Sequence, residues 1–289
     1  MKILSFGEIL WDVFPDGAFI GGAPLNLAAH TALQGADSRV VSAVGDDDYK
    51  EKTLNEVKAL GVKTDYISIL TSKITGKCLV SFDENHVPSY NLLDDVAYDY
   101  IQVPEISSDA RFDILAFGTL ALRHENNIAT LKELIGMEVC ENIYSDLNIR
   151  PPFYSDESIR FCVENANIVK ISDEELPTVL DALNIENTDI EGAVKSLTKK
   201  YSQLKIIIIT CGENGAYCYD VKNCKMHYTP AEKTKFISAV GAGDSFGATF
   251  LVEYFKGKSI PECLALAAKV SAFVVSCNGA VPQYDINKL

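Results

Sequence analysis

The stretch Ser238-Ala239-Val240-Gly241-Ala242-Gly243-Asp244-Ser245-Phe246-Gly247-Ala248-Thr249-Phe250 places two glycines and a carboxylate at the start of a segment with the apolar content of a buried helix. Small residues let backbone N–H groups approach an anion closely, and the positive end of the helix adds to the attraction. The pattern suits an aspartate that takes a proton from an attacking hydroxyl while the amides of Gly241, Ala242 and Gly243 hold a phosphoryl group. The alternative is that Asp244 caps the helix and the glycines only allow a tight entry into it.

The composition predicts one folded unit without a nucleic-acid or membrane surface. The chain has 289 residues, 47% of them hydrophobic, enough to bury the core of a single domain over residues 1–289 with a small appendage. Its net charge of -14 argues against nucleic acid and anionic membranes as partners, because both attract clustered Lys and Arg. A small anionic ligand remains compatible with this charge, since backbone amides hold phosphate locally.

The cysteines, histidines and apolar runs bear on redox state and location. The 8 cysteines form no CxxC pair and the 4 histidines lie far apart in sequence, so we expect reduced core cysteines and no structural metal site. The acidic Glu8 follows the first short apolar segment, which is unlike a signal peptide, and no apolar run reaches membrane-spanning length. These features together favour the cytoplasm.

Strand and helix patterns alternate over most of the chain. The predicted strands are 3–7, 39–44, 65–70, 113–117, 142–145, 168–171, 205–210 and 216–219. The predicted helices are 24–34, 50–60, 125–135, 155–165, 190–200, 243–255 and 261–277. This alternation is typical of an α/β fold with a mainly parallel sheet and helices on both faces. The strand at 205–210 is so uniformly apolar that we expect both of its faces to be covered.

Residues 71–101 break this rhythm. Two strands with antiparallel patterning, at 77–82 and 87–92, flank a turn at 83–85. A sheet of two or three strands is not stable alone, so we predict a small β appendage that acts as a lid over the site or as a subunit interface.

Polar residues follow several of the predicted strands. Gly22 precedes a helix that starts at Pro24, and Asn26 lies in its first turn, where it meets either ligand hydroxyls or solvent. Ser172 and Glu175 have the spacing of a capping box, which is the structural alternative to a role in the site. Because parallel strands end at a common edge of the sheet, we expect convergence there of Asp12, Gly22, Asn26, Asp146, Asn148, Arg150, Glu175, Gly212 and Asp244.

Four stretches in this order carry a family resemblance. They are Gly21-Gly22-Ala23-Pro24-Leu25-Asn26 with Gly45-Asp46-Asp47 after it, Asp146-Leu147-Asn148-Ile149-Arg150-Pro151, Thr210-Cys211-Gly212-Glu213-Asn214-Gly215, and Gly241-Ala242-Gly243-Asp244. With them the chain resembles the ribokinase-like sugar kinases of the PfkB group, and within that group most of all the fructokinases. The combination is far more specific than any one stretch.

The resemblance implies ATP-dependent phosphorylation of a sugar hydroxyl, with fructose as the first candidate sugar. By similarity Asp244 is the base, and the amides of Gly241, Ala242 and Gly243 form the anion hole. The implied sugar-site residues are Asp12, Gly22, Asn26, Asp146, Asn148 and Arg150. The residues implied to border ATP are Thr210, Gly212, Gly215, Asn278 and Gly279, and Glu175 is implied to organise magnesium through its waters.

The resemblance also implies a β lid made of segments 12–22 and 75–100, through which members of the family often form homodimers. Ser238 and Ala239 replace an Asp-Thr pair that helps to hold a monovalent cation in many members, so activation by potassium stays open. Ser172 replaces a usual Asn, as it does in fructokinase-like members.

Other functions remain to be weighed. A dinucleotide-binding oxidoreductase fits poorly, because Gly241, Gly243 and Gly247 are spaced one residue too widely for GxGxxG. A sugar sensor without turnover is a second alternative, against which the intact Asp244 argues. Within the kinase class, 2-keto-3-deoxygluconate, ribose and a nucleoside are the alternative substrates.

Overall fold

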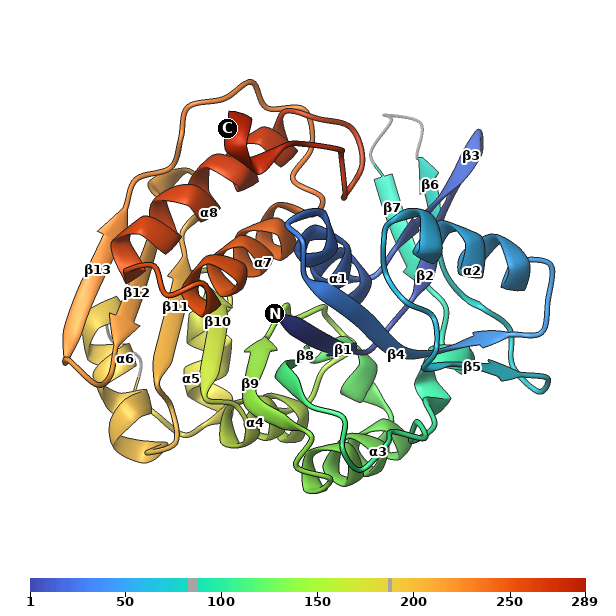
Figure 1. Cartoon of the computed structure of the whole chain (residues 1–289), viewed down its shortest axis with the longest axis horizontal. Coiled ribbons are helices and arrows are strands. Elements are labelled where there is room, and N and C mark those ends of the chain that lie inside the picture. Colours follow the sequence, from blue (N-terminus) through green and yellow to red (C-terminus); the bar gives the residue numbers. More distant parts are fainter. Residues whose placement is uncertain (83–87, 187–188) are drawn as a thin grey trace.

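The main sheet of the structure, a computed structural model that describes residues 1–82, 88–186 and 189–289, holds nine strands within those ranges (Figure 1). Their order across the sheet is β13-β12-β11-β10-β9-β8-β1-β4-β5. All neighbouring pairs are parallel except β11 with β12 and β12 with β13. The strands span Lys2–Phe6 (β1), Asp37–Gly45 (β4), Ile67–Leu70 (β5), Phe112–Phe117 (β8), Cys140–Asp146 (β9), Ile168–Ser172 (β10), Ile206–Thr210 (β11), Ala216–Asp220 (β12) and Lys225–Thr229 (β13). The predicted mainly parallel sheet is therefore confirmed.

Helices cover both faces of this sheet. One group packs on one face with α1, α7 and α8, next to which lies α2, and the other face carries α3 to α6 (Figure 1). The helices span Ala23–Leu33 (α1), Lys50–Ala59 (α2), Glu125–Gly136 (α3), Asp156–Asn165 (α4), Leu176–Ala182 (α5), Ile190–Lys200 (α6), Ala242–Phe255 (α7) and Ile260–Val275 (α8). Sequence patterning did not predict α5 or β13, which are short and adjoin polar turns.

Strand β11 illustrates why the sheet is buried on both sides. Ile207 and Ile209 lie in the core beneath α3 to α6, whereas Ile206 and Ile208 lie in the core beneath α7 and α8. Successive side chains of a strand point to opposite faces, so a run of apolar residues requires a cover on each. The expectation from the apolar run at 205–210 is confirmed.

A smaller sheet stands beside the main one. Its strand order is β3-β2-β6-β7, with spans Leu10–Phe14 (β2), Gly17–Gly21 (β3), Gly76–Phe82 (β6) and Pro88–Leu92 (β7). The predicted antiparallel pair β6 and β7 is present, and the predicted turn at 83–85 lies outside the described residues. Residues 97–100 leave this sheet and form a 3-10 turn, in which the ring of Tyr98 is fully buried.

The cysteines and helix lengths complete the description of the chain. The eight cysteines form no disulfide in the described parts of the chain, and several are buried, but Cys224 is exposed, so the expectation of core cysteines is wrong there. Cys224 lies in the turn between β12 and β13, where its backbone has a positive φ of 49°. None of the helices in the described ranges is long and apolar enough to span a bilayer.

Candidate functional site

The start of α7 decides between the two interpretations of Asp244. The residue that caps this helix is Gly241, with φ of 80°, and Asp244 lies inside the first turn. The interpretation of Asp244 as the helix cap is therefore wrong. A Cβ atom on Gly241 would lie 2.2 Å from the carbonyl oxygen of Ala280, so both the backbone angle and the close approach require glycine.

The amides of this turn differ in what they contact. The N–H group of Ala242 donates to the carbonyl oxygen of Ala239 at 3.2 Å. Among the described residues, no backbone oxygen accepts from the N–H groups of Gly241, Gly243 or Asp244. Donors at the first turn of a helix that lack an internal partner are available to an anion. The amide of Ala242, which sequence reasoning included in the anion hole, is already engaged.

Helix α1 brings Asn26 to Asp244. The cap of α1 is Gly22, with φ of 117°, and the side-chain amide of Asn26 donates from Nδ2 to Oδ2 of Asp244 at 2.8 Å. Burial raises the pKa of Asp244 above its usual value, and the hydrogen bond from Asn26 opposes this by favouring the ionised form. Asp244 is thus a carboxylate with an elevated pKa next to free amides.

One cavity joins Asp244 to residues of α1, β8 and β9 and of the loops that follow β1 and β9. Its lining includes Glu8, Tyr144, Asp146 and Asn148. Asn148 follows β9 in a left-handed conformation with φ of 40°, which is uncommon outside glycine.

Asp146 is held by a lysine that sequence reasoning missed. Lys170 lies beside Asp146 in the parallel register of β9 and β10, and its Nζ is 2.8 Å from each carboxylate oxygen. Burial raises the pKa of Asp146 to about 6, while the charge of Lys170 acts to lower it. A lysine inside the apolar strand Ile168–Ser172 is the sequence signal that pointed to this pair.

Glu8 is the second residue that sequence reasoning did not place in the site. Its side chain is 3% exposed, and its Oε1 accepts the N–H of Ala23 at the start of α1 at 3.2 Å. Burial raises the pKa of Glu8 to about 7. Its position directly after the first buried strand was the signal, because strand ends of an α/β sheet carry the ligand sites.

Two further sugar-site candidates lie on the side of the small sheet. Asp12 is half-buried on β2, and its pKa is raised by burial and lowered by the nearby charge of Arg150. The guanidinium of Arg150 is exposed, and no ion pair or hydrogen bond engages it within the described ranges. The structure therefore leaves opposite charges facing the site from two segments.

Glu175 has the contacts of a capping residue. Its Oε1 accepts the N–H of Ile149 at 2.6 Å, its Oε2 accepts that of Ser172 at 2.9 Å, and its own N–H donates to Oγ of Ser172 at 3.2 Å. The reciprocal bonds predicted for a capping box are present. The same bonds fix the carboxylate at the end of β10, one residue beyond the loop that carries Asn148.

The candidate nucleotide residues lie in two loops. Thr210 ends β11 and Gly212 and Gly215 follow it, and among the described residues no hydrogen bond joins this loop to Asp244. Gly212 is exposed, whereas Gly215 is buried against Thr229. Asn278 and Gly279 are exposed after α8 and adjoin Ala280, whose carbonyl lies against Gly241.

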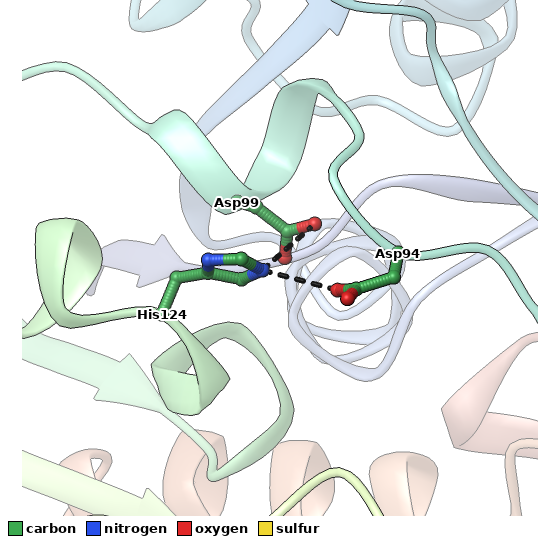
Figure 2. Close-up of side chains that lie close together, drawn as sticks. All are labelled: Asp94, Asp99 and His124. Carbon is green, nitrogen blue, oxygen red and sulfur yellow. Dashed lines mark hydrogen bonds and ion pairs between the residues drawn. The ribbon is translucent and has the colours of Figure 1, made fainter.

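A cluster of Asp94, Asp99 and His124 has the composition of a metal site (Figure 2). Nε2 of His124 lies 3.1 Å from Oδ1 of Asp94 and 3.6 Å from Oδ2 of Asp99. The guanidinium of Arg123, however, donates to both oxygens of Asp99 at 2.7 Å. Because this fixed positive charge neutralises Asp99 and would repel a metal ion, we describe the cluster as a joint between segment 93–100 and the turn after β8.

Known proteins match nearly the whole length of this chain. A curated relative, the probable fructokinase-5 of Arabidopsis thaliana, is 28% identical over 311 aligned residues, which cover 97% of this chain and 93% of that protein. Among solved structures, the fructokinase with bound ATP from Xylella fastidiosa superimposes with a TM-score of 0.85 at 21% identity, covering 97% of this chain and 94% of its own. The fructokinase from Vibrio cholerae O395 in its fructose, ADP and calcium ion bound form has a TM-score of 0.84 at 21% identity and covers 98% and 95%.

These likenesses confirm the expected ribokinase-like fold with a small second sheet. Residues 16–286 match the family model described as pfkB family carbohydrate kinase. With that match over most of its length, the chain belongs to the pfkB family of carbohydrate kinases.

Proposed function

We propose that this protein transfers the γ-phosphoryl group of ATP to a hydroxyl of a sugar, with fructose as the substrate. The observation that supports this most strongly is the carboxylate of Asp244 beside the free amides of Gly241 and Gly243 at the start of α7. A base and an anion site within one helical turn are what transfer of a phosphoryl group to a hydroxyl requires.

In this mechanism Asp244 takes the proton of the sugar hydroxyl as its oxygen attacks the γ-phosphorus. The new O–P bond forms while the bond to the β-phosphate oxygen breaks, and ADP leaves with that electron pair. The raised pKa of Asp244 makes it a stronger base near neutral pH than a solvated aspartate. The amides of Gly241 and Gly243 stabilise the negative charge on the phosphoryl oxygens.

The sugar binds in this proposal between the main and small sheets. Asp12, Asn26 and Asn148 accept and donate hydrogen bonds to hydroxyls, and the backbone of Gly22 allows close approach. Asp146 serves mainly to hold Lys170, because both of its oxygens already accept from that lysine. Arg150, whose guanidinium has no partner within the described ranges, is free to contact the sugar or the phosphate.

The nucleotide binds along the loops that hold Thr210, Gly212, Gly215, Asn278 and Gly279. Magnesium, when it enters with ATP, neutralises charge on the phosphates. Glu175 fits an indirect role, since backbone amides fix both of its oxygens and leave one lone pair on each for a metal-bound water. Ser238 and Ala239 are weak ligands for a monovalent cation, so potassium dependence is part of the test.

Fructose is favoured over the other sugars by the likeness to the three fructokinases over nearly the whole chain. The test is ADP release with fructose, 2-keto-3-deoxygluconate, ribose and nucleosides, each with and without potassium. Turnover on fructose at least tenfold faster than on the others supports the proposal, and preference for another compound replaces fructose with it.

Asp244→Asn separates the kinase from a sugar sensor. The variant is expected to lower kcat by about 100-fold or more while calorimetry still detects sugar binding, because only the proton acceptor is lost. An active Asn variant would contradict the assignment of the base. Binding of a sugar without turnover in the wild-type protein would favour the sensor.

A further inference from the structure

Three polar side chains lie along one face of helix α1 and its C-terminal cap residue. Asn26, His30 and Gln34 follow at intervals of four residues, which places them on one face, and their side chains are 6%, 0% and 8% exposed. Helix α1 lies beside α7 (Figure 1). Nδ2 of Asn26 bonds Asp244, and Nε2 of Gln34 donates to Oγ1 of Thr249, five residues further along α7.

His30, the middle one of the three, contacts the segment after α8. Its Nε2 is 2.9 Å from the carbonyl oxygen of Ala280, and its Nδ1 is 3.0 Å from the hydroxyl of Tyr284. A carbonyl only accepts, so Nε2 carries the hydrogen, and the neutral ring then accepts from Tyr284 at Nδ1. Burial lowers the pKa of His30 to about 4, which is consistent with this neutral form.

The carbonyl of Ala280 is the one that lies against Gly241. A Cβ atom on Gly241 would be 2.2 Å from this oxygen, so the turn at the start of α7 and the 278–281 segment fit without spare room. Gly241 is therefore in close contact with Ala280, and Gly279 and Asn278 lie one and two residues before Ala280 in the chain. The single side chain that bonds this carbonyl among the described residues is His30.

We propose that His30 is a positioning residue for phosphoryl transfer, which holds the Ala280 carbonyl against Gly241 and so sets the anion-binding amides relative to Asp244. Asn26, one turn earlier on α1, holds the carboxylate of Asp244 itself. One rigid helix thus orients both the base and the amides. This proposal rests on the proposed function and adds a residue that touches neither sugar nor nucleotide.

The test compares two substitutions of the same residue. In His30→Gln the side-chain amide reaches the position of Nε2 and still donates to Ala280, whereas in His30→Asn it reaches only the position of Nδ1. His30→Asn is expected to lower kcat about tenfold and to weaken ADP binding several-fold, and His30→Gln to stay within about threefold of wild type. Sugar affinity is expected to be unchanged in both.

The matched control is Thr31→Val. Thr31 is the next residue on α1 and is also fully buried, but its hydroxyl bonds Ala28 and Ser38, away from α7. This variant is expected to lower Tm without changing kcat or ADP affinity. If His30→Asn lowers Tm as Thr31→Val does but leaves kcat and ADP affinity within twofold of wild type, the proposal is overturned.

Two further measurements keep the test decisive. If His30→Asn does not fold, His30→Leu, which fills similar space but donates no hydrogen bond to Ala280, is expected to lower kcat about tenfold; an unchanged kcat overturns the proposal. If the wild-type protein phosphorylates no sugar, the proposed function fails. The ADP affinities of the same variants, measured by calorimetry, still test whether His30 sets the 278–281 segment.

Discussion

The carboxylate of Asp244 is half-buried and bonded to the side-chain amide of Asn26, and these two features act on its pKa in opposite directions. Burial disfavours the charged form, and a hydrogen bond donated to the carboxylate favours it. A general base must be deprotonated to act, so the balance between the two sets the lower limit of the pH range for turnover.

Asn26→Ala is expected to raise the pKa of Asp244 further, because it removes the bond that favours ionisation. Since turnover requires the ionised form, the acid limb of the kcat profile then moves to higher pH. The measurement is kcat between pH 5 and pH 9 at saturating sugar and ATP, with Thr31→Val as the control whose profile stays in place. An acid limb that moves to lower pH would contradict the role of Asn26.

Glu8 gives a stability effect with the opposite chemistry, since its pKa rises from the usual 4.5 to about 7 on burial. The folded chain thus keeps this proton to higher pH than the unfolded chain, so its contribution to the free energy of unfolding is lost as pH rises from about 4.5 to 7.

Glu8→Gln removes this dependence while keeping an oxygen for the N–H of Ala23. Relative to wild type, the variant is expected to gain up to about 3 kcal/mol of unfolding free energy between pH 4 and pH 8. Urea unfolding at both pH values measures it. An equal difference at the two pH values would show that folding does not raise the pKa of Glu8.

At the scale of elements, the register of β9 and β10 places Lys170 beside Asp146. Both side chains are buried, and Nζ of Lys170 lies so close to α7 that a Cβ on Gly243 would be 3.2 Å from it. The pair therefore links two strands of the sheet to the helix that carries Asp244. A buried ion pair adds little net stability over apolar residues, but loss of one partner leaves a charge without compensation.

Lys170→Met is accordingly expected to lower the free energy of unfolding by about 3–5 kcal/mol, and Lys170→Met with Asp146→Leu to recover most of it. Urea unfolding measures both. Lys195→Met is the matched control, because Lys195 pairs with Glu191 at 2.6 Å on the exposed face of α6, and it is expected to stay close to wild type. A double variant no more stable than the single one would contradict this account of the pair.

At the scale of the whole molecule, the small sheet is the part whose role depends on other contacts. Phe19 on β3 is 63% exposed and pairs in register with Asp12 on β2, so its ring stands on the same face as a sugar-site candidate. We propose that residues 1–289 form one domain whose lid segments, 12–22 and 75–100, cover the site and join two subunits. Large exposed apolar side chains are typical of such surfaces.

Phe19→Asp tests the interface. The wild-type chain of 31.6 kDa is expected to sediment with twice that mass at micromolar concentration, and the variant with the mass of one chain at unchanged Tm, because an aspartate buried between subunits has no partner. A wild-type protein that stays monomeric would overturn the dimer and leave the lid role to be tested by activity.

Sequence patterning alone determined the α/β order, the doubly covered strand at 205–210 and the helix that starts beside Asp244. These depend on periodicity and on local backbone preferences, which a short window of residues contains. The same holds for the Ser172 and Glu175 capping box. Patterning missed α5, β13 and the strands β2 and β3, which are short, and β2 and β3 lack a clear alternation of apolar and polar residues.

Only the tertiary structure decided which groups share the site and how they are charged. Lys170 meets Asp146 across 24 residues of sequence, and His30 meets Ala280 across 250. The raised pKa values of Glu8 and Asp244 come from desolvation, which arises only when distant segments close around a carboxylate. The cap position of Gly241 was likewise settled by its contact with Ala280, because local preference alone also allowed Asp244 to cap the helix.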